Sequence, residues 1–104
     1  MPPIRVLIVD DSMVTRSILS DLLQSDPAIE IAATASNGRM ALSLIPQVKP
    51  DLVTLDFEMP GMNGLETLAG IRNINPQLPS VALPSPWKHW RGAPPTTSPN
   101  PLWQ

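Results

Sequence analysis

Three aspartates stand where carboxylates could take part in chemistry. Asp10 and Asp11 follow the apolar run of residues 4–9, and Asp56 ends the shorter apolar run of residues 52–55. Both runs are typical of strands buried in a parallel sheet, and ligands of such sheets bind at the carboxyl ends of the strands. If the two strands are neighbours, the three carboxylates converge, and their repulsion favours a hard divalent cation such as Mg²⁺. One carboxylate could then attack phosphorus.

Simpler roles are open to the same residues. Asp10 and Asp11 could cap a following helix, because carboxylates are favourable at helix N-termini. Asp56 could cap a loop. A doubled Asp after one apolar strand and a third Asp after another are hard to explain by capping alone, so we interpret the group as a site for Mg²⁺ and phosphoryl chemistry.

The remaining segments predict the elements that would position these aspartates. Apolar spacing indicates helices over residues 13–24, 40–48 and 65–71, and residues 29–35 read as a further strand. Pro46 lies inside the second helix, which we expect it to kink or end early. The alternation of strands and helices predicts an α/β fold with a truncated, doubly wound parallel sheet of three strands and three helices. Residues 80–83 are a candidate fourth strand, and we find no fifth.

Composition excludes several classes of function. A chain of 104 residues has room for one domain with a modest core. With a net charge of −2 and no basic cluster, nothing supports nucleic-acid binding, and the absence of cysteine excludes disulfides and thiolate metal sites. No apolar run could span a bilayer, and the first residues lead into a strand rather than a signal peptide. We expect a soluble, cytoplasmic protein without membrane insertion.

The last part of the chain differs in composition from the rest. Residues 76–104 hold eight of the fourteen prolines and all three tryptophans. Neither a helix nor a central strand can run through Pro94 and Pro95, because proline fixes φ and lacks a backbone donor. We therefore expect an incomplete domain over residues 1–79 and an irregular Pro/Trp-rich tail over residues 80–104.

The motifs around the aspartates resemble the receiver domain of bacterial two-component response regulators. The resemblance is carried by Val6-Leu7-Ile8-Val9-Asp10-Asp11-Ser12 and by Leu55-Asp56-Phe57-Glu58-Met59-Pro60-Gly61-Met62-Asn63-Gly64. Three stretches resemble more narrowly the receiver of the chemotaxis protein-glutamate methylesterase: Asp26-Pro27-Ala28-Ile29-Glu30, Ala35-Ser36-Asn37-Gly38, and Thr54-Leu55-Asp56 with Glu58-Met59-Pro60. The resemblance covers residues 4–79 and implies a flavodoxin-like fold.

The resemblance implies a role for each matching residue. Asp56 would be the phosphoacceptor for a histidine kinase of a chemotaxis-type system. The Mg²⁺ ligands would be Asp10, Asp11, Asp56 and the backbone carbonyl of Glu58. Pro60 and Gly64 would shape the adjoining loop, although ordinary turn chemistry explains them equally well.

The chain departs from the receiver pattern after residue 79. Receivers carry a Ser or Thr at the end of the fourth strand and a Lys at the end of the fifth. Pro84 falls where the hydroxyl residue should be, and Ser85 comes one position later. Lys88 is the only lysine after Lys49, and it comes too early. A chain of this kind keeps the carboxylates but lacks the switch hydroxyl and the lysine.

One hypothesis for the tail is a shifted reading frame. Each codon from Trp87 onward can be regrouped so that a new codon takes the third base of the codon before it. Residues 87–91 then permit Leu-Glu-Ala-Leu-Ala, and residues 92–101 permit Arg-Gly-Ala-Ser-Asp-Tyr-Val-Thr-Lys-Pro. The second string closely resembles the receiver segment that bears the missing lysine.

The leading interpretation is a signalling module, a receiver without the esterase domain of the family it resembles. No Ser occurs in a Gly-x-Ser-x-Gly setting, so we expect no esterase activity from this chain. An inert truncated product is the first alternative. A Mg²⁺-dependent aspartyl phosphatase is less favoured, because such enzymes need an acid two residues after the nucleophile, where Asp10 has Ser12; Asp56 has Glu58 there but comes late in the chain. The tail could also be a polyproline ligand, but it lacks basic flanks.

Overall fold

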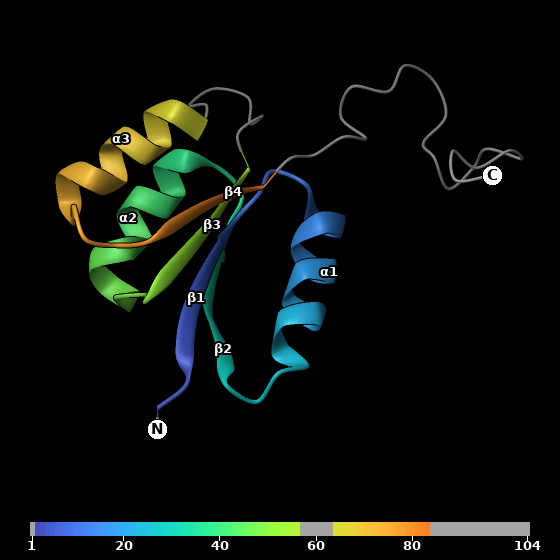
Figure 1. The fold of residues 1–104 in the computed structure, drawn as a ribbon. Helices are drawn as coiled ribbons and strands as arrows, with labels where there is room; N and C mark the ends of the chain where they lie inside the picture. The colour runs from blue at the N-terminus through green and yellow to red at the C-terminus, as the bar shows by residue number, and fades with distance from the viewer. Residues whose placement is uncertain (1, 57–63, 84–104) are drawn as a thin grey trace, which may run out of the picture.

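The computed structural model describes residues 2–56 and 64–83. Strands and helices alternate along this part of the chain (Figure 1). In order, the elements are β1 (Ile4–Val9), α1 (Met13–Gln24), β2 (Ile29–Ala35), α2 (Gly38–Val48), β3 (Leu52–Asp56), α3 (Gly64–Ile74) and β4 (Ser80–Leu83). The structure thus confirms the three predicted strands and three helices and adds β4, which the sequence offered only as a candidate.

The strands form one parallel sheet in the order β2-β1-β3-β4. β1 and β3 are the inner strands, and β2 and β4 are the edges within the described residues. Figure 1 shows α1 on one face of the sheet and α2 with α3 on the other. This arrangement is the doubly wound α/β fold, in which helical crossovers connect parallel strands and cover both faces.

The main core lies between the sheet and the pair α2 and α3. Leu7 and Val9 of β1 and Val53 and Leu55 of β3 alternate along their strands and point to this side, because successive strand residues face opposite ways. The full set of buried core residues is Leu7, Val9, Ala35, Ala41, Ile45, Val53, Leu55, Ile71 and Leu78. Burying this apolar surface is the main stabilising contribution to the fold.

The opposite face of β1 is buried as well. Val6 and Ile8, which alternate with the core positions, are 1% and 0% exposed. The near-continuous apolar sequence of β1 therefore reflects burial on both faces, as expected for an inner parallel strand.

Side chains and backbone geometry set the limits of α2. The helix is capped at its start by Asn37, whose side chain accepts a hydrogen bond of 2.7 Å from the amide of Met40. It ends at Lys49, which has the left-handed conformation with φ 50°. The early end expected at Pro46 was wrong, because the helix continues to Val48, and the kink expected as the other outcome stays a prediction. A proline removes one backbone donor, and the buried Ile45 beside it keeps the last turn on the core.

Candidate metal and phosphoacceptor site

The register of the two inner strands brings the aspartates together. Val9 lies opposite Leu55 in the parallel pairing of β1 and β3. The residues that follow, Asp10 and Asp56, therefore leave the sheet side by side at its carboxyl edge. Ligand oxygens of Asp10, Asp11 and Asp56 all lie within 4.8 Å of one another. This is the convergence that the sequence predicts if the strands are neighbours.

The three aspartates differ in exposure. Asp10 is only 3% exposed and Asp56 only 1%, whereas Asp11 is half-buried. The cluster thus has a buried floor formed by Asp10 and Asp56 and a more accessible side at Asp11. Such a site can admit a small ligand from solvent while its floor is kept away from bulk water.

Backbone and side-chain hydrogen bonds hold Asp10 in place. Its amide donates to the carbonyl of Ala35 at the end of β2. Its side-chain Oδ1 accepts a bond of 2.9 Å from the amide of Ser12. Its carbonyl accepts a bond of 2.7 Å from Nη1 of Arg16 in α1. Contacts to β2 and α1, together with a bond inside the loop, therefore fix the loop after β1.

Ser12 caps the helix that follows the site. Its Oγ accepts a bond of 3.2 Å from the amide of Thr15, and its backbone is extended, as an N-cap requires. The capping role considered for Asp10 and Asp11 is therefore filled by Ser12. Ser12 is also the residue two positions after Asp10, where an aspartyl phosphatase would need an acid.

The donor set suits a hard divalent cation. Several carboxylate oxygens at this separation repel one another strongly, and part of that repulsion is relieved when a cation lies between them. Carboxylate oxygens with retained water are the ligands that Mg²⁺ prefers. The residues present therefore fit the metal that the receiver resemblance implies.

The other predicted site residues are only partly covered by the described residues. Gly64 is buried at the first position of α3. Glu58 and Pro60 lie outside the described residues, as do Pro84, Ser85 and Lys88. Their expected roles stay predictions. Of the irregular tail expected over residues 80–104, residues 80–83 form β4 and the rest lies outside the described residues.

Arg16 is a site residue that sequence reasoning missed. It reaches back from α1 to the Asp10 carbonyl and is half-buried there. No recognised motif links the two positions. The only available signal was a long cationic side chain in the first turn of a helix that starts beside an acidic cluster.

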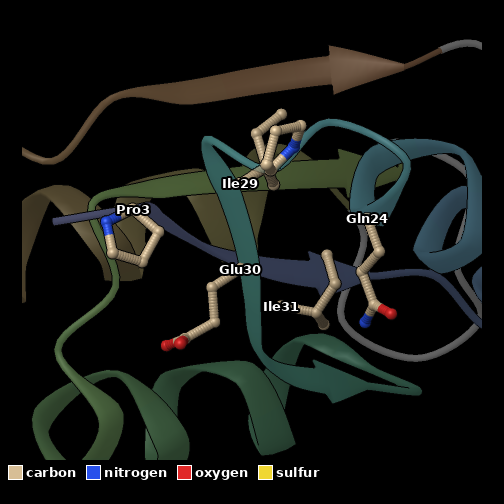
Figure 2. Close-up of a pocket in the computed structure, with 6 residues that line it drawn as sticks. Pro3, Gln24, Ile29, Glu30 and Ile31 are labelled. Atoms are coloured by element: carbon tan, nitrogen blue, oxygen red, sulfur yellow. The ribbon is translucent and has the colours of Figure 1, made fainter. Parts of the chain in front are cut away.

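A surface depression elsewhere in the molecule offers no comparable chemistry. It lies at the amino end of the sheet and is lined by Pro3, Gln24, Pro27, Ile29, Glu30 and Ile31 (Figure 2). Its one ionisable side chain, Glu30, pairs with Arg5 at 3.0 Å. The aspartate cluster at the opposite edge is therefore the strongest candidate site among the described residues.

Comparison with known proteins identifies the class that this fold and site define. The family described as the response regulator receiver domain matches residues 6–86. The chain therefore belongs to the response regulator receiver family. Among the described residues, no helix is long and apolar enough to cross a membrane.

Curated relatives narrow the similarity to one branch of this family. The chain is 53% identical over 81 residues to a protein-glutamate methylesterase/protein-glutamine glutaminase of Nocardioides sp., covering 78% of this chain and 22% of the relative. It is 49% identical over 81 residues to the protein of the same name from Trichodesmium erythraeum, covering 78% and 23%. The chain thus spans about a fifth of the length of these relatives.

Solved structures show the same fold. The response regulator domain of Thermotoga maritima CheB is 35% identical, with a TM-score of 0.76 over 88% of this chain and 66% of that one. A CheX–CheY–BeF₃–Mg²⁺ complex from Borrelia burgdorferi is 32% identical, with a TM-score of 0.75 over 80% of this chain and 63% of the matched chain. The similarity confirms the receiver resemblance drawn from the sequence motifs.

Proposed function

We propose that this chain is a phosphoacceptor module of a chemotaxis-type two-component system. Asp56 would take a phosphoryl group from the phosphohistidine of a histidine kinase. The observation that carries the proposal is the convergence of Asp10, Asp11 and Asp56 within 4.8 Å at the carboxyl edge of a parallel sheet. Membership of the receiver family and the methylesterase relatives support the choice of kinase partner and pathway.

The nucleophile in this proposal is a carboxylate oxygen of Asp56. It would form a bond to phosphorus as the bond between phosphorus and the histidine nitrogen breaks, and the bonding electron pair would leave with the imidazole. The product is an acyl phosphate on Asp56. Burial of Asp56 would protect this product, because a side chain that is 1% exposed is held away from bulk water that would hydrolyse the acyl phosphate.

Asp10 and Asp11 would hold Mg²⁺ together with Asp56 and the backbone carbonyl of Glu58. The bound metal would neutralise negative charge on the incoming phosphoryl oxygens. The hydrogen bonds of Asp10 to Ser12, and through its carbonyl to Arg16, would keep the metal ligand oriented before the phosphoryl group arrives. The solved B. burgdorferi complex contains CheX, CheY, BeF₃ and Mg²⁺ together, which supports the choice of Mg²⁺.

The proposal gives the chain no esterase activity of its own. The curated relatives carry that activity in their names, but this chain spans about a fifth of their length. It would act as a receiver and not as a methylesterase.

Labelling with acetyl phosphate tests the proposal. The chain is incubated with acetyl phosphate and Mg²⁺, and its intact mass is measured for the gain of one phosphoryl group. We expect labelling in the wild type and in Asp21→Asn, an exposed charge-matched control on α1, and none in Asp56→Asn. No labelling of a folded wild-type chain would support the inert product instead. Repeated turnover that depends on Asp10 would support the phosphatase.

A further inference from the structure

A surface groove lies at the amino edge of the sheet, between the C-terminal ends of α2 and α3. Both helices end at this edge, because each leads into the start of the strand that follows it, β3 or β4. The groove has a volume of about 400 Å³ and is lined only by residues that the structure describes. It therefore lies at the opposite edge of the sheet from the aspartate cluster.

The walls of the groove are apolar. Ile45, Pro50 and Leu78 are buried and form its floor, whereas Pro46 and Ile74 are exposed and form its sides. Ile45 and Leu78 also belong to the main core, so the floor is a fixed part of the fold. Sites that bind small molecules are mostly apolar concavities of about 300–1,000 Å³, and the groove lies at the lower end of this range.

Two polar side chains line the groove, and both act there as hydrogen-bond donors. Lys49 carries an ammonium group, which can only donate. The Oδ1 of Asn75 accepts a bond of 3.0 Å from the amide of Gln77. This bond leaves the NH₂ group of Asn75 as the part of the side chain that can bind a ligand. The groove thus presents two donors and suits a ligand that brings acceptor oxygens.

Lys49 occupies its position at a cost to the backbone. Its φ of 50° lies in the left-handed region, which glycine adopts freely and other residues adopt with strain. The Arg5 side chain holds this turn by donating to the carbonyls of Val48 and Lys49. Within the described residues, the one ion pair joins Arg5 to Glu30, so the Lys49 ammonium has no carboxylate partner there. A lysine kept in a strained conformation beside an apolar groove points to a functional role.

We propose that this groove binds a small monocarboxylate with an apolar body. The carboxylate accepts hydrogen bonds from the Lys49 ammonium and the Asn75 NH₂ group, and a bond to a charged donor is the stronger kind. The apolar body covers Ile74 and Leu78 and releases water from them. A neutral ligand leaves the ammonium unpaired, and a ligand with two negative charges exceeds what one ammonium balances. The site is separate from the aspartates and does not depend on the proposed phosphoacceptor function.

Hexanoate is the probe that tests the site. It is titrated into the full ¹⁵N-labelled chain, and backbone amide NMR spectra are recorded. We expect saturable shifts at Lys49, Asn75 and Leu78, none at Ser12 on the opposite edge, and a Kd on the order of 1 mM, as suits a ligand of few atoms. Hexanol should bind at least about tenfold more weakly, because it lacks the charged hydrogen bond. If a chain with the dispersed spectrum of a folded protein shows no saturable shifts, or binds both probes equally, the proposal is overturned.

Variants of Lys49 separate binding from a purely structural role. Lys49→Met removes the charge and keeps the apolar stem, and Lys49→Gly also relieves the backbone strain. Both should raise the Kd for hexanoate about tenfold or more, while Lys49→Gly keeps or raises the thermal midpoint. Arg39→Met, which removes an exposed positive charge at the other end of α2, is the matched control and should bind like the wild type. Unchanged affinity in the Lys49 variants would refute the role of the ammonium.

Asn75→Asp tests the second donor. The substitution keeps an acceptor oxygen for the Gln77 amide and replaces the NH₂ group by a carboxylate oxygen. It should abolish binding of hexanoate, because the two carboxylates repel each other, and should leave the weaker binding of hexanol in place. If hexanoate still binds this variant with wild-type affinity, the ligand lies elsewhere and the groove assignment is wrong.

Discussion

Val9 of β1 lies directly opposite Leu55 of β3 in a parallel register. Each is the residue before an aspartate, so this single pairing places Asp10 beside Asp56. A shift of the register by one position would move one of them to the other face of its strand, because strand side chains alternate. The acidic site is therefore a direct consequence of how the two inner strands pair.

Metal binding should stabilise the chain through this cluster. We expect the thermal midpoint of the wild type to rise on adding Mg²⁺, by an amount that corresponds to about 2.7 kcal/mol when Mg²⁺ is at a hundred times its Kd. Asp10→Asn and Asp56→Asn should show little or no rise, and Asp21→Asn should behave like the wild type. In EDTA, Asp56→Asn should be at least as stable as the wild type, because one repelling charge is gone. If the thermal midpoint of the wild type did not change on adding Mg²⁺, the metal assignment would be contradicted.

Arg16 should contribute to stability by joining α1 to the end of β1. Arg16→Met keeps most of the apolar stem and removes the hydrogen bond of 2.7 Å to the Asp10 carbonyl. Hydrogen bonds that involve a charged group contribute about 1.5–3 kcal/mol, and we expect a loss at the lower end because the residue is half-buried. Urea unfolding measures the change. Arg72→Met, at an exposed position in the last turn of α3, is the matched control and should cost less than about 0.5 kcal/mol.

Gly70 makes room for Leu42 where α2 packs on α3. A Cβ at residue 70 would lie 2.6 Å from Cδ1 and 2.9 Å from Cδ2 of Leu42. Gly70→Ala should therefore destabilise the chain by about 1 kcal/mol, since the cost of overpacking exceeds the gain in helix propensity. In a Leu42→Ala background the same substitution should become stabilising by up to about 1 kcal/mol. A double-mutant cycle in urea checks this reversal of sign, and additive effects would exclude the contact.

Two leucine truncations should separate buried from exposed apolar positions. Leu7→Ala removes a side chain that is 0% exposed and should cost about 2–5 kcal/mol. Leu22→Ala, at a position that is 64% exposed on α1, should cost less than about 1 kcal/mol. This cost is a large part of a usual folding margin of about 5–15 kcal/mol, so we expect a much lower urea midpoint for Leu7→Ala than for the wild type. If both substitutions lowered the free energy of unfolding equally, the exposed position of Leu22 on α1 would have to be covered in solution.

The nucleotide sequence tests the reading-frame hypothesis without any protein. Sequencing from the codon for Pro76 to several hundred bases past Gln104 should reveal a second frame that encodes Asp-Tyr-Val-Thr-Lys-Pro and continues into a methylesterase domain. If no frame continues the family, the tail is the native sequence.

Most of the fold could be predicted because its signals are local. Apolar runs and helical spacing marked the elements correctly, and the strand-helix alternation implied a parallel sheet. The helix does not end early at Pro46, because the effect of this proline depends on the packing of Ile45, which a local pattern does not contain. The apolar positions of α1 were predicted, but Val14, Ile18 and Leu22 are 68%, 54% and 64% exposed. Spacing shows which side chains share a face, and only the neighbours decide whether that face is covered.

The sequence by itself determined the chemistry of this protein: the three carboxylates, their places after apolar strands and the motifs of a receiver. These are properties of residue type and order along the chain. The tertiary structure decided which groups meet. The register of Val9 and Leu55 and the strand order β2-β1-β3-β4 depend on segments that are distant in sequence, and the bond from Arg16 to the Asp10 carbonyl depends on where α1 packs. Contacts of this kind follow from the packing of the whole sheet, and no local pattern encodes them.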